Sequence, residues 1–295
     1  MSTTETNLDA KAPPPERVPE PAVVLDPALD PGRRSSTARN TSRVPPVPHL
    51  IASLRNWLTD LLMPPVCLAC QEAIASRDAL CPGCWSGVDF IGPPLCDRLG
   101  IRLPYSTGGA MISAAAAARP PPYARARAVA HYEGAMRKLV HGLKFRDRHE
   151  VRSLFGTWLC RAGSELIEDA DVIVPVPLSR SRLLQRRFNQ SAILAQEVAR
   201  ISGLPVHTTA LHRTRRTQRQ VGLSREQRRD NVRGAFEVPR RQLANIQGRR
   251  VLLIDDVITT GATAEACTTT LLKAGATDVD VLAVAIVADP LRITT

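Results

Sequence analysis

Apolar strand-like runs that alternate with amphipathic helices constrain the fold of this 295-residue chain more than any other feature. From about residue 124 the runs "RARAVAHYE", "DVIVPVP", "VLLID" and "DVDVLAVAIVA" are separated by helix-like segments such as "GAMRKLVHGLKF", "VRSLFGTWLCRAGSELI" and "SAILAQEVARISG". Short apolar runs bounded by charge are typical of strands buried on both faces of a parallel sheet. The alternation therefore predicts an α/β domain with right-handed crossovers, whose ligands bind beyond the carboxyl ends of the strands.

One strand end carries an unusual group of side chains. In "VLLIDDVITTGAT" an apolar run ends at Asp255 and Asp256, and Thr-Thr-Gly follows. Small and hydroxyl residues come next, with apolar residues at helical spacing later, so a helix should begin near residues 260–262. Strand, acidic turn and helix N-terminus are thus predicted to meet at one point.

This meeting point suits a phosphorylated sugar. Backbone N–H groups at a glycine turn, threonine hydroxyls and the positive end of a helix dipole favour a phosphate. Two carboxylates would repel that phosphate, but they can hold sugar hydroxyls or Mg²⁺. Phosphoribosyl pyrophosphate (PRPP) has the matching groups: a ribose, a 5′-phosphate and a pyrophosphate that binds metal.

Parts of this stretch also occur in unrelated kinds of protein. Strands that end in Asp-Asp are found in phospho-acceptor and hydrolase folds, and threonine at a helix start is often only an N-cap. The whole stretch, however, resembles the PRPP signature of type I phosphoribosyltransferases. The sequence contains no GxxxxGK[ST] string, which argues against a P-loop NTPase.

The first 48 residues are rich in proline, charge and small polar residues, and predict a disordered tail. The start of the chain lacks the basic and apolar regions of a signal peptide. No apolar run reaches the roughly 18 residues of a membrane span, so we expect a cytoplasmic protein without membrane insertion.

The net charge of +11 and the pI near 10 indicate acidic partners, either phosphate ligands or nucleic acid. Arginine supplies most of this charge and concentrates in "LLQRRFNQ" and "LHRTRRTQRQVGLSREQRRDNVRG". The planar guanidinium suits phosphate recognition. A solvated basic face is the alternative and accounts for part of these residues.

Two CxxC pairs predict a metal site near the start of the folded region. The four candidate ligands are Cys67, Cys70, Cys81 and Cys84. Four thiolates hold Zn²⁺ in a closed, structural site, and a cytosolic setting favours metal over disulfides; a redox-active CxxC is the alternative. A further CxxC pair would need cysteine at Leu99, so Cys96 is expected to be a spare thiol.

These motifs together resemble the ComF family of competence-associated proteins. The resemblance rests on the cysteines, "HYEG", "LKF", "IVPVPLSRSRLLQRRFNQ", "RTRRTQRQVGLSREQRRDNVRGAF" and "VLLIDDVITTGAT", and it covers about residues 50–290. It implies a helix plus zinc-finger module over 49–105 and a type I phosphoribosyltransferase-like domain over 124–290. Arg187 departs from the family's "RGFNQ" pattern, as Leu99 departs from its second cysteine pair.

The resemblance also implies roles for individual residues. Asp255 and Asp256 would bind the ribose hydroxyls. The loop for the 5′-phosphate would comprise Thr259, Thr260, Gly261, Ala262 and Thr263. The pyrophosphate loop would comprise Leu178, Ser179 and Arg180. The flexible loop would contribute Arg215, Gln220 and Arg228, and the acceptor side Tyr132 and Glu133. For Tyr132, Gln220 and Arg228 a structural role is the alternative.

The implied reaction is displacement of Mg²⁺-bound pyrophosphate from C1 of the ribose by an incoming nucleophile. The sequence offers no residue that stands out as a general base, and it does not name the acceptor. The resemblance also implies a link to DNA uptake, with PRPP as ligand and single-stranded DNA or the competence machinery as partners. The alternative is a non-catalytic module on the same fold that binds single-stranded DNA or responds to PRPP. Aromatic residues make up only 4% of the chain, which leaves few stacking platforms for single strands.

Overall fold

The computed structural model describes residues 64–287, apart from residue 107 and the segments 146–149, 179–187 and 216–224. The predicted tail over 1–48 and the predicted helix that precedes the cysteines lie outside the described residues. Within them, no helix is both long enough and apolar enough to cross a bilayer.

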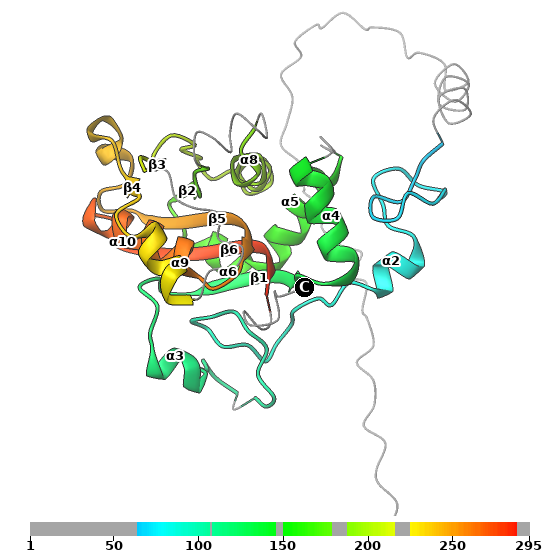
Figure 1. Cartoon of the computed structure of the whole chain (residues 1–295), viewed down its shortest axis with the longest axis horizontal. Helices are drawn as coiled ribbons and strands as arrows, with labels where there is room; N and C mark the ends of the chain where they lie inside the picture. The colour runs from blue at the N-terminus through cyan, green and yellow to red at the C-terminus, as the bar shows by residue number, and fades with distance from the viewer. Residues whose placement is uncertain (1–63, 107, 146–149, 179–187, 216–224, 288–295) are drawn as a thin grey trace, which may run out of the picture. The chain divides into compact units, whose positions relative to one another are not determined.

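The central element is a four-stranded parallel sheet, with strand order β1-β6-β5-β2. Its strands are β1 (Ala126–His131), β2 (Val172–Pro175), β5 (Arg250–Ile258) and β6 (Asp278–Ile286). The strands are buried along almost their whole length, as expected for a sheet with both faces covered. The predicted parallel sheet is confirmed, and all four carboxyl ends lie at the same edge (Figure 1).

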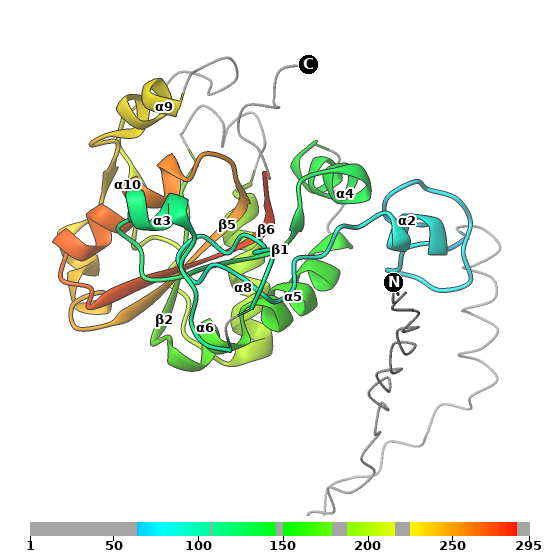
Figure 2. The same cartoon turned by 90° about the horizontal axis from the view of Figure 1, so that it is seen from below.

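Helices cover both faces of the sheet (Figure 2). One face carries α4 (Gly134–Phe145), α5 (Val151–Ala162), α6 (Ser164–Asp169) and α8 (Gln190–Ser202). The other carries α9 (Arg225–Val232), α10 (Ala262–Lys273), the 3-10 helix η1 (Arg240–Asn245) and the two-stranded β3 (His212–Arg213) and β4 (Phe236–Glu237). Alternate residues of each strand feed the two cores: Leu252 and Ile254 pack on the first, and Val251 and Leu253 on the second.

The segment 151–167 forms two helices where the sequence predicts one. Gly163 ends α5, and its N–H donates to the carbonyl of Leu159. A Cβ at this glycine would lie 2.8 Å from the side chain of Leu282. A larger residue at this position would have to displace the Leu282 side chain of β6, and α5 ends at this glycine.

An ion cluster closes the amino-terminal edge of the sheet. Asp280 has no solvent exposure, and both of its oxygens accept hydrogen bonds from Arg125 and Arg250. Burial alone would raise the pKa of Asp280, but these two guanidinium groups hold it below its usual value. This cluster lies at the opposite edge from the strand ends on which the function was predicted.

The cysteine-containing region packs along the edge strand β1. The N–H of Ile91 donates to the carbonyl of Val129, and the N–H of His131 donates to that of Asp89. The aromatic rings of Trp85 and Phe90 lie 5.8 Å and 5.1 Å from the ring of Trp158 on α5. Two short helices lie in this region, α2 (Pro82–Ser86) and α3 (Ala114–Ala118). The predicted fold class, a parallel sheet flanked by helices with a small four-cysteine module before it, is confirmed.

Candidate functional site

A cavity of about 210 Å³ opens at the carboxyl edge of the sheet. Its walls come from β5, from the segments that follow β1, β2 and β5, and from α4, α8, α10 and β3. The residues of the predicted site that line it are Asp255, Asp256, Thr259, Gly261, Thr263, Leu178 and Tyr132. The fold thus brings together side chains that the sequence places more than 100 positions apart.

Asp255 is buried within the sheet, and it lies inside β5, which continues to Ile258 beyond the predicted strand end. One of its oxygens accepts hydrogen bonds from Ser191 Oγ (3.1 Å) and from the backbone N–H of Asp256 (2.8 Å). Burial, followed by repulsion from the Asp256 carboxylate, raises the pKa of Asp255 to about 7. Near neutral pH the folded protein therefore holds Asp255 partly protonated.

Asp256 is paired with a cation that the sequence interpretation did not select. Lys144 Nζ lies 2.8 Å from Asp256 Oδ2, and both side chains are largely buried. The same ammonium group lies 6.0 Å from the centre of the Tyr132 ring. Lys144 belongs to the "LKF" motif in the last turn of α4. The sequence signal that could have identified it is this lysine at the end of an amphipathic helix.

Ser191 and Arg213 are two further cavity residues that the sequence interpretation missed. Ser191 lies in the first turn of α8, whose N-cap is Asn189. The Arg213 guanidinium lies 5.3 Å from the centre of the Phe236 ring, across the β3–β4 pair. An N-cap signal precedes Ser191 in the sequence, but two-residue strands leave no periodicity from which Arg213 could have been placed.

The turn between β5 and α10 is shaped for a small anion. Gly261 is the N-cap residue with a φ of +79°, and Ala262 begins the helix within the predicted range. In the described residues no side chain caps this helix, and the buried Thr260 Oγ1 has no hydrogen-bond partner. Uncapped N–H groups at a helix N-terminus and an unsatisfied hydroxyl are suitable donors for a phosphate.

Other predicted residues are not among those that line the cavity, or lie outside the described residues. Thr260 and Ala262 are buried within the same turn, between the lining residues Thr259 and Thr263, and Glu133 is exposed. Arg215 is exposed, and it donates to the carbonyls of Asp230 and Asn231 at the end of α9. Ser179, Arg180 and Gln220 lie outside the described residues, as does the side chain of Arg228.

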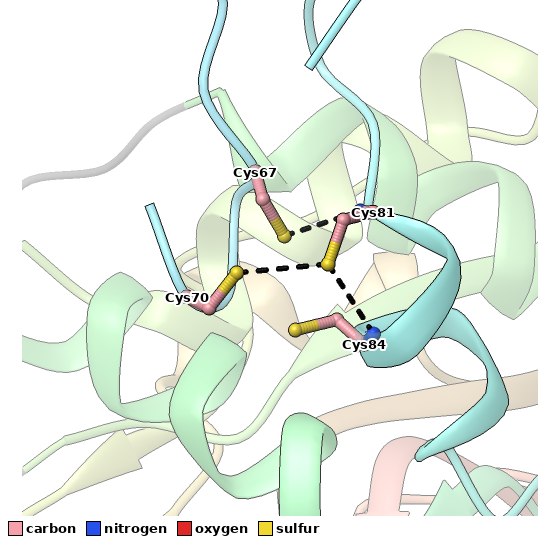
Figure 3. A group of neighbouring side chains, drawn as sticks. All are labelled: Cys67, Cys70, Cys81 and Cys84. Atoms are coloured by element: carbon pink, nitrogen blue, oxygen red, sulfur yellow. Dashed lines mark hydrogen bonds between the residues drawn. The ribbon is translucent and has the colours of Figure 1, made fainter. Parts of the chain in front are cut away.

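The four predicted zinc ligands form one cluster (Figure 3). The four Sγ atoms lie within 4.8 Å of one another, and those of Cys70 and Cys81 are 3.6 Å apart. A tetrahedral site with Zn–S bonds of about 2.3 Å places its sulfurs about 3.8 Å apart, close to this spacing. Cys67 Sγ and Cys81 Sγ accept backbone N–H bonds of 3.3 and 3.4 Å, which stabilise thiolates. The cluster therefore fits a closed structural zinc site.

Comparison with known proteins gives relatives for both parts of the chain. A model described as "Double zinc ribbon domain" matches residues 58–116. The chain is 33% identical over 224 residues to DNA utilization protein YhgH of Salmonella typhimurium, covering 73% of this chain and 88% of that protein. It is 28% identical over 221 residues to Competence protein F of Haemophilus influenzae, covering 73% and 94%. With Competence protein ComFC of Bacillus subtilis it shares 28% over 153 residues, covering 50% and 58%.

Among solved structures, glutamine PRPP amidotransferase from Bacillus subtilis, complexed with ADP and GMP, matches with a TM-score of 0.32 and 28% identity. The match covers 45% of this chain and 26% of the amidotransferase.

Proposed function

The chain belongs to the ComF family, and from this premise we propose that it is a PRPP-binding, Mg²⁺-dependent phosphoribosyltransferase-like protein linked to DNA uptake. The observation that carries the proposal is that one cavity is lined both by the Asp255–Asp256 pair and by the uncapped Gly261 turn. Carboxylates and phosphate donors in one small cavity match a ligand with both hydroxyls and phosphates. PRPP combines these groups.

In this proposal each part of the cavity binds a different part of PRPP. The two carboxylates accept hydrogen bonds from the ribose 2- and 3-hydroxyls. The turn over residues 259–263 binds the 5′-phosphate at the positive end of α10. The pyrophosphate extends toward Leu178 and the segment after it, and the acceptor approaches from the side of Tyr132.

Mg²⁺ is expected to arrive with the pyrophosphate. Among the described residues, the four cysteines are the only group of three or more metal-ligand side chains. An Asp pair alone is a poor cage for Mg²⁺, which usually binds one or two carboxylates together with substrate phosphates. The bound ion would neutralise charge on the leaving pyrophosphate.

The described residues contribute positioning and charge. Breaking the C1–pyrophosphate bond leaves positive charge on the ribose, and the Asp256 carboxyl group, which pairs with Lys144 in this cavity, would stabilise it. Lys144 neutralises Asp256 in the free protein and becomes available to the anionic ligand when the ribose hydroxyls take its place. No described side chain is assigned as the general base, so the acceptor's own acidity decides whether one is needed.

A calorimetric titration with PRPP, with and without Mg²⁺, tests this proposal. We expect Mg²⁺-dependent binding that weakens at least tenfold in Asp255→Asn and in Asp256→Asn. Asp278→Asn is the matched control, because this half-exposed carboxylate pairs with Arg250 at the opposite edge of the sheet. Unchanged affinity in both site variants would refute the assignment.

A second candidate function is nucleic-acid binding. Exposed Arg137 and Lys138 of α4 line a cavity of about 660 Å³ beside the Cys67–Cys70 turn. The names of the relatives point to DNA utilization and competence. DNA affinity should then fall steeply with salt, and the double variant Arg137→Ala/Lys138→Ala should reduce the slope. Weak or salt-insensitive binding by the wild-type protein would argue against this function.

A further inference from the structure

The segment around Cys96 repeats the backbone of the first cysteine turn. Each residue of the Cys67–Cys70 turn has a counterpart 29 positions later, from Cys67 to Cys96 and from Cys70 to Leu99. The N–H of Gln71 donates to the carbonyl of Cys67, and the N–H of Gly100 donates to that of Cys96. Gln71 and Gly100 also share a positive φ, +70° and +65°. The second turn therefore keeps the shape of a metal-binding knuckle.

The isolated antiparallel bridges that flank each turn repeat as well. The bridge between Val66 and Ala73 corresponds to the bridge between Leu95 and Arg102. The backbone hydrogen bond from Cys67 to Glu72 has its equivalent from Cys96 to Ile101, and both are 2.8 Å long. These equivalences extend the repeat beyond the turn itself.

The second halves of the two repeats also correspond to each other. Here the spacing is 32 positions, from Cys81 to Ser113. Both residues are N-caps of five-residue helices, with φ, ψ of −66°, 158° at Cys81 and −65°, 153° at Ser113. Their side chains accept from the N–H groups of Cys84 and Ala116, respectively. The N–H of Cys81 donates to Cys67 Sγ at 3.3 Å, and that of Ser113 donates to Cys96 Sγ at 3.2 Å.

We propose that residues 94–118 form a second ribbon that folds without metal, with Cys96, Leu99, Ser113 and Ala116 at the four positions that hold metal in the first ribbon. The extent of the matched double-ribbon model agrees, because it ends at Ala116, the fourth of these positions. Only Cys96 retains a thiol, so the second ribbon lacks the donors for a thiophilic cation. The inference does not depend on PRPP binding.

Contacts with β1 replace the metal as the support of this second ribbon. The buried Arg127 side chain donates to the carbonyl and to the carboxylate of Asp97, and it also pairs with Glu165 at 2.6 Å. The N–H of Ala126 donates to the carbonyl of Asp97, so a backbone hydrogen bond links β1 to the second ribbon. A Cβ at Gly100 would lie 2.5 Å from the carbonyl oxygen of Ala126, which shows how closely the turn packs on the strand.

Restoring the missing thiols tests the proposal. Zinc per chain would be measured by elemental analysis on the full-length protein and on the triple variant Leu99→Cys/Ser113→Cys/Ala116→Cys. We expect one zinc in the wild type and two in the triple variant. The control Ile112→Cys/Ala114→Cys/Ala117→Cys adds three thiols at exposed neighbouring positions and should keep one. One zinc in a folded triple variant, or two in the control, would overturn the proposal.

A single conservative variant keeps the test decisive if the triple variant does not fold. Ser113→Cys places one thiol beside Cys96 in the ribbon geometry. Mild oxidation with diamide, which takes up the two electrons and two protons of the thiols, should join them in a disulfide and lower the protein mass by about 2 Da. Ala117→Cys, on the exposed side of α3, should not form this bond. Absence of the disulfide in Ser113→Cys would overturn the proposal.

Discussion

Asp255 and Asp280 are two carboxylates in the same sheet, both shielded from solvent, whose neighbours shift their pKa values in opposite directions. Asp280 accepts hydrogen bonds from Arg125 and Arg250, which lower its pKa. Asp255 has Asp256 beside it, and burial together with this neighbour raises its pKa to about 7. A buried carboxyl group with a raised pKa in a cavity is typical of a functional site. Its ionised form is unfavourable in the folded protein, so it contributes to ligand binding and not to stability.

The raised pKa of Asp255 predicts a specific dependence of stability on pH. Between about pH 4 and pH 7 the folded protein holds a proton on Asp255 that the unfolded chain has released, so stability falls as pH rises through this window. Asp255→Asn removes this effect and should be more stable than the wild type at pH 8, by at least about 1 kcal/mol. The difference should shrink toward pH 5.

Urea unfolding of both proteins at pH 5 and pH 8 measures this effect. Asp280→Asn serves as the control with the opposite sign, since its carboxylate is stabilised by two guanidinium groups and its replacement should destabilise the protein at pH 8. A difference between wild type and Asp255→Asn that stays constant with pH would contradict the prediction.

Lys144→Met should weaken PRPP binding about tenfold, which corresponds to about 1.4 kcal/mol. The variant removes the ammonium group that lies 2.8 Å from Asp256 and leaves this carboxyl group without that ion pair. Lys138→Met on the same helix is the matched control, because Lys138 is exposed and does not line this cavity. Titration calorimetry of both variants distinguishes a local role of Lys144 from a general effect of charge, and equal losses would contradict the local role.

Among the elements, the turn between β5 and α10 places Gly261, with its positive φ, at the N-terminus of α10. Gly261→Ala places a Cβ no closer than 3.8 Å to its neighbours, so steric clash is not the issue. The φ of +79° is the obstacle, and an ordinary residue in this region costs about 1–2 kcal/mol. We expect a comparable loss of stability and a loss of PRPP affinity of at least tenfold.

Gly248→Ala separates these two effects. Gly248 has a φ of +69° in a turn before β5, with nothing within 4 Å of the added Cβ. Thermal unfolding should show a similar destabilisation for both variants, whereas calorimetry should show lost PRPP affinity only for Gly261→Ala. Equal PRPP affinities would mean that the turn does not bind the phosphate.

The elements that the sequence predicts best are those with strong periodicity. Helix α4 has the predicted bounds, and the strands around Val172, Leu252 and Val281 form the predicted parallel sheet. The β3–β4 pair and η1 were not predicted, because two-residue strands and a single 3-10 segment carry no period. Residues 225–231 of the flexible loop, predicted over 215–231, belong to the helix α9, whose strongly charged sequence lacks an apolar face.

The candidate site was predictable where one segment of chain supplies its residues. The residues from Asp255 to Thr263 are continuous in the sequence, so the order of carboxylates, threonines and glycine is enough to predict a site for hydroxyls and a phosphate. Lys144, Ser191 and Arg213 come from three other elements, and they meet at the cavity only because the parallel strands end at one edge. Their roles depend on packing that no local pattern specifies.

At the scale of the whole molecule, the zinc module and the sheet domain share an aromatic contact that reports on their association. Trp85 lies in α2, directly after Cys84, and its ring contacts that of Trp158 on α5. Removing zinc with a chelator should release the first ribbon, because structural zinc sites supply folding free energy directly. Tryptophan emission should change, while far-UV circular dichroism retains the signal of the helices and sheet.

The variant Trp85→Phe should show a smaller emission change on chelation. Loss of the whole circular dichroism signal together with zinc would contradict this account, since it would mean that the sheet domain cannot fold without the first ribbon.

In the proposed function, one cavity binds the 5′-phosphate, the ribose and the pyrophosphate of PRPP together. Phosphorus NMR of Mg²⁺-PRPP, titrated with the protein, tests it most directly because each phosphorus has its own resonance. We expect the 5′-phosphate and pyrophosphate resonances all to shift or broaden at stoichiometric protein, and Asp256→Asn to abolish the effect. Unchanged resonances with excess wild-type protein would contradict the claim.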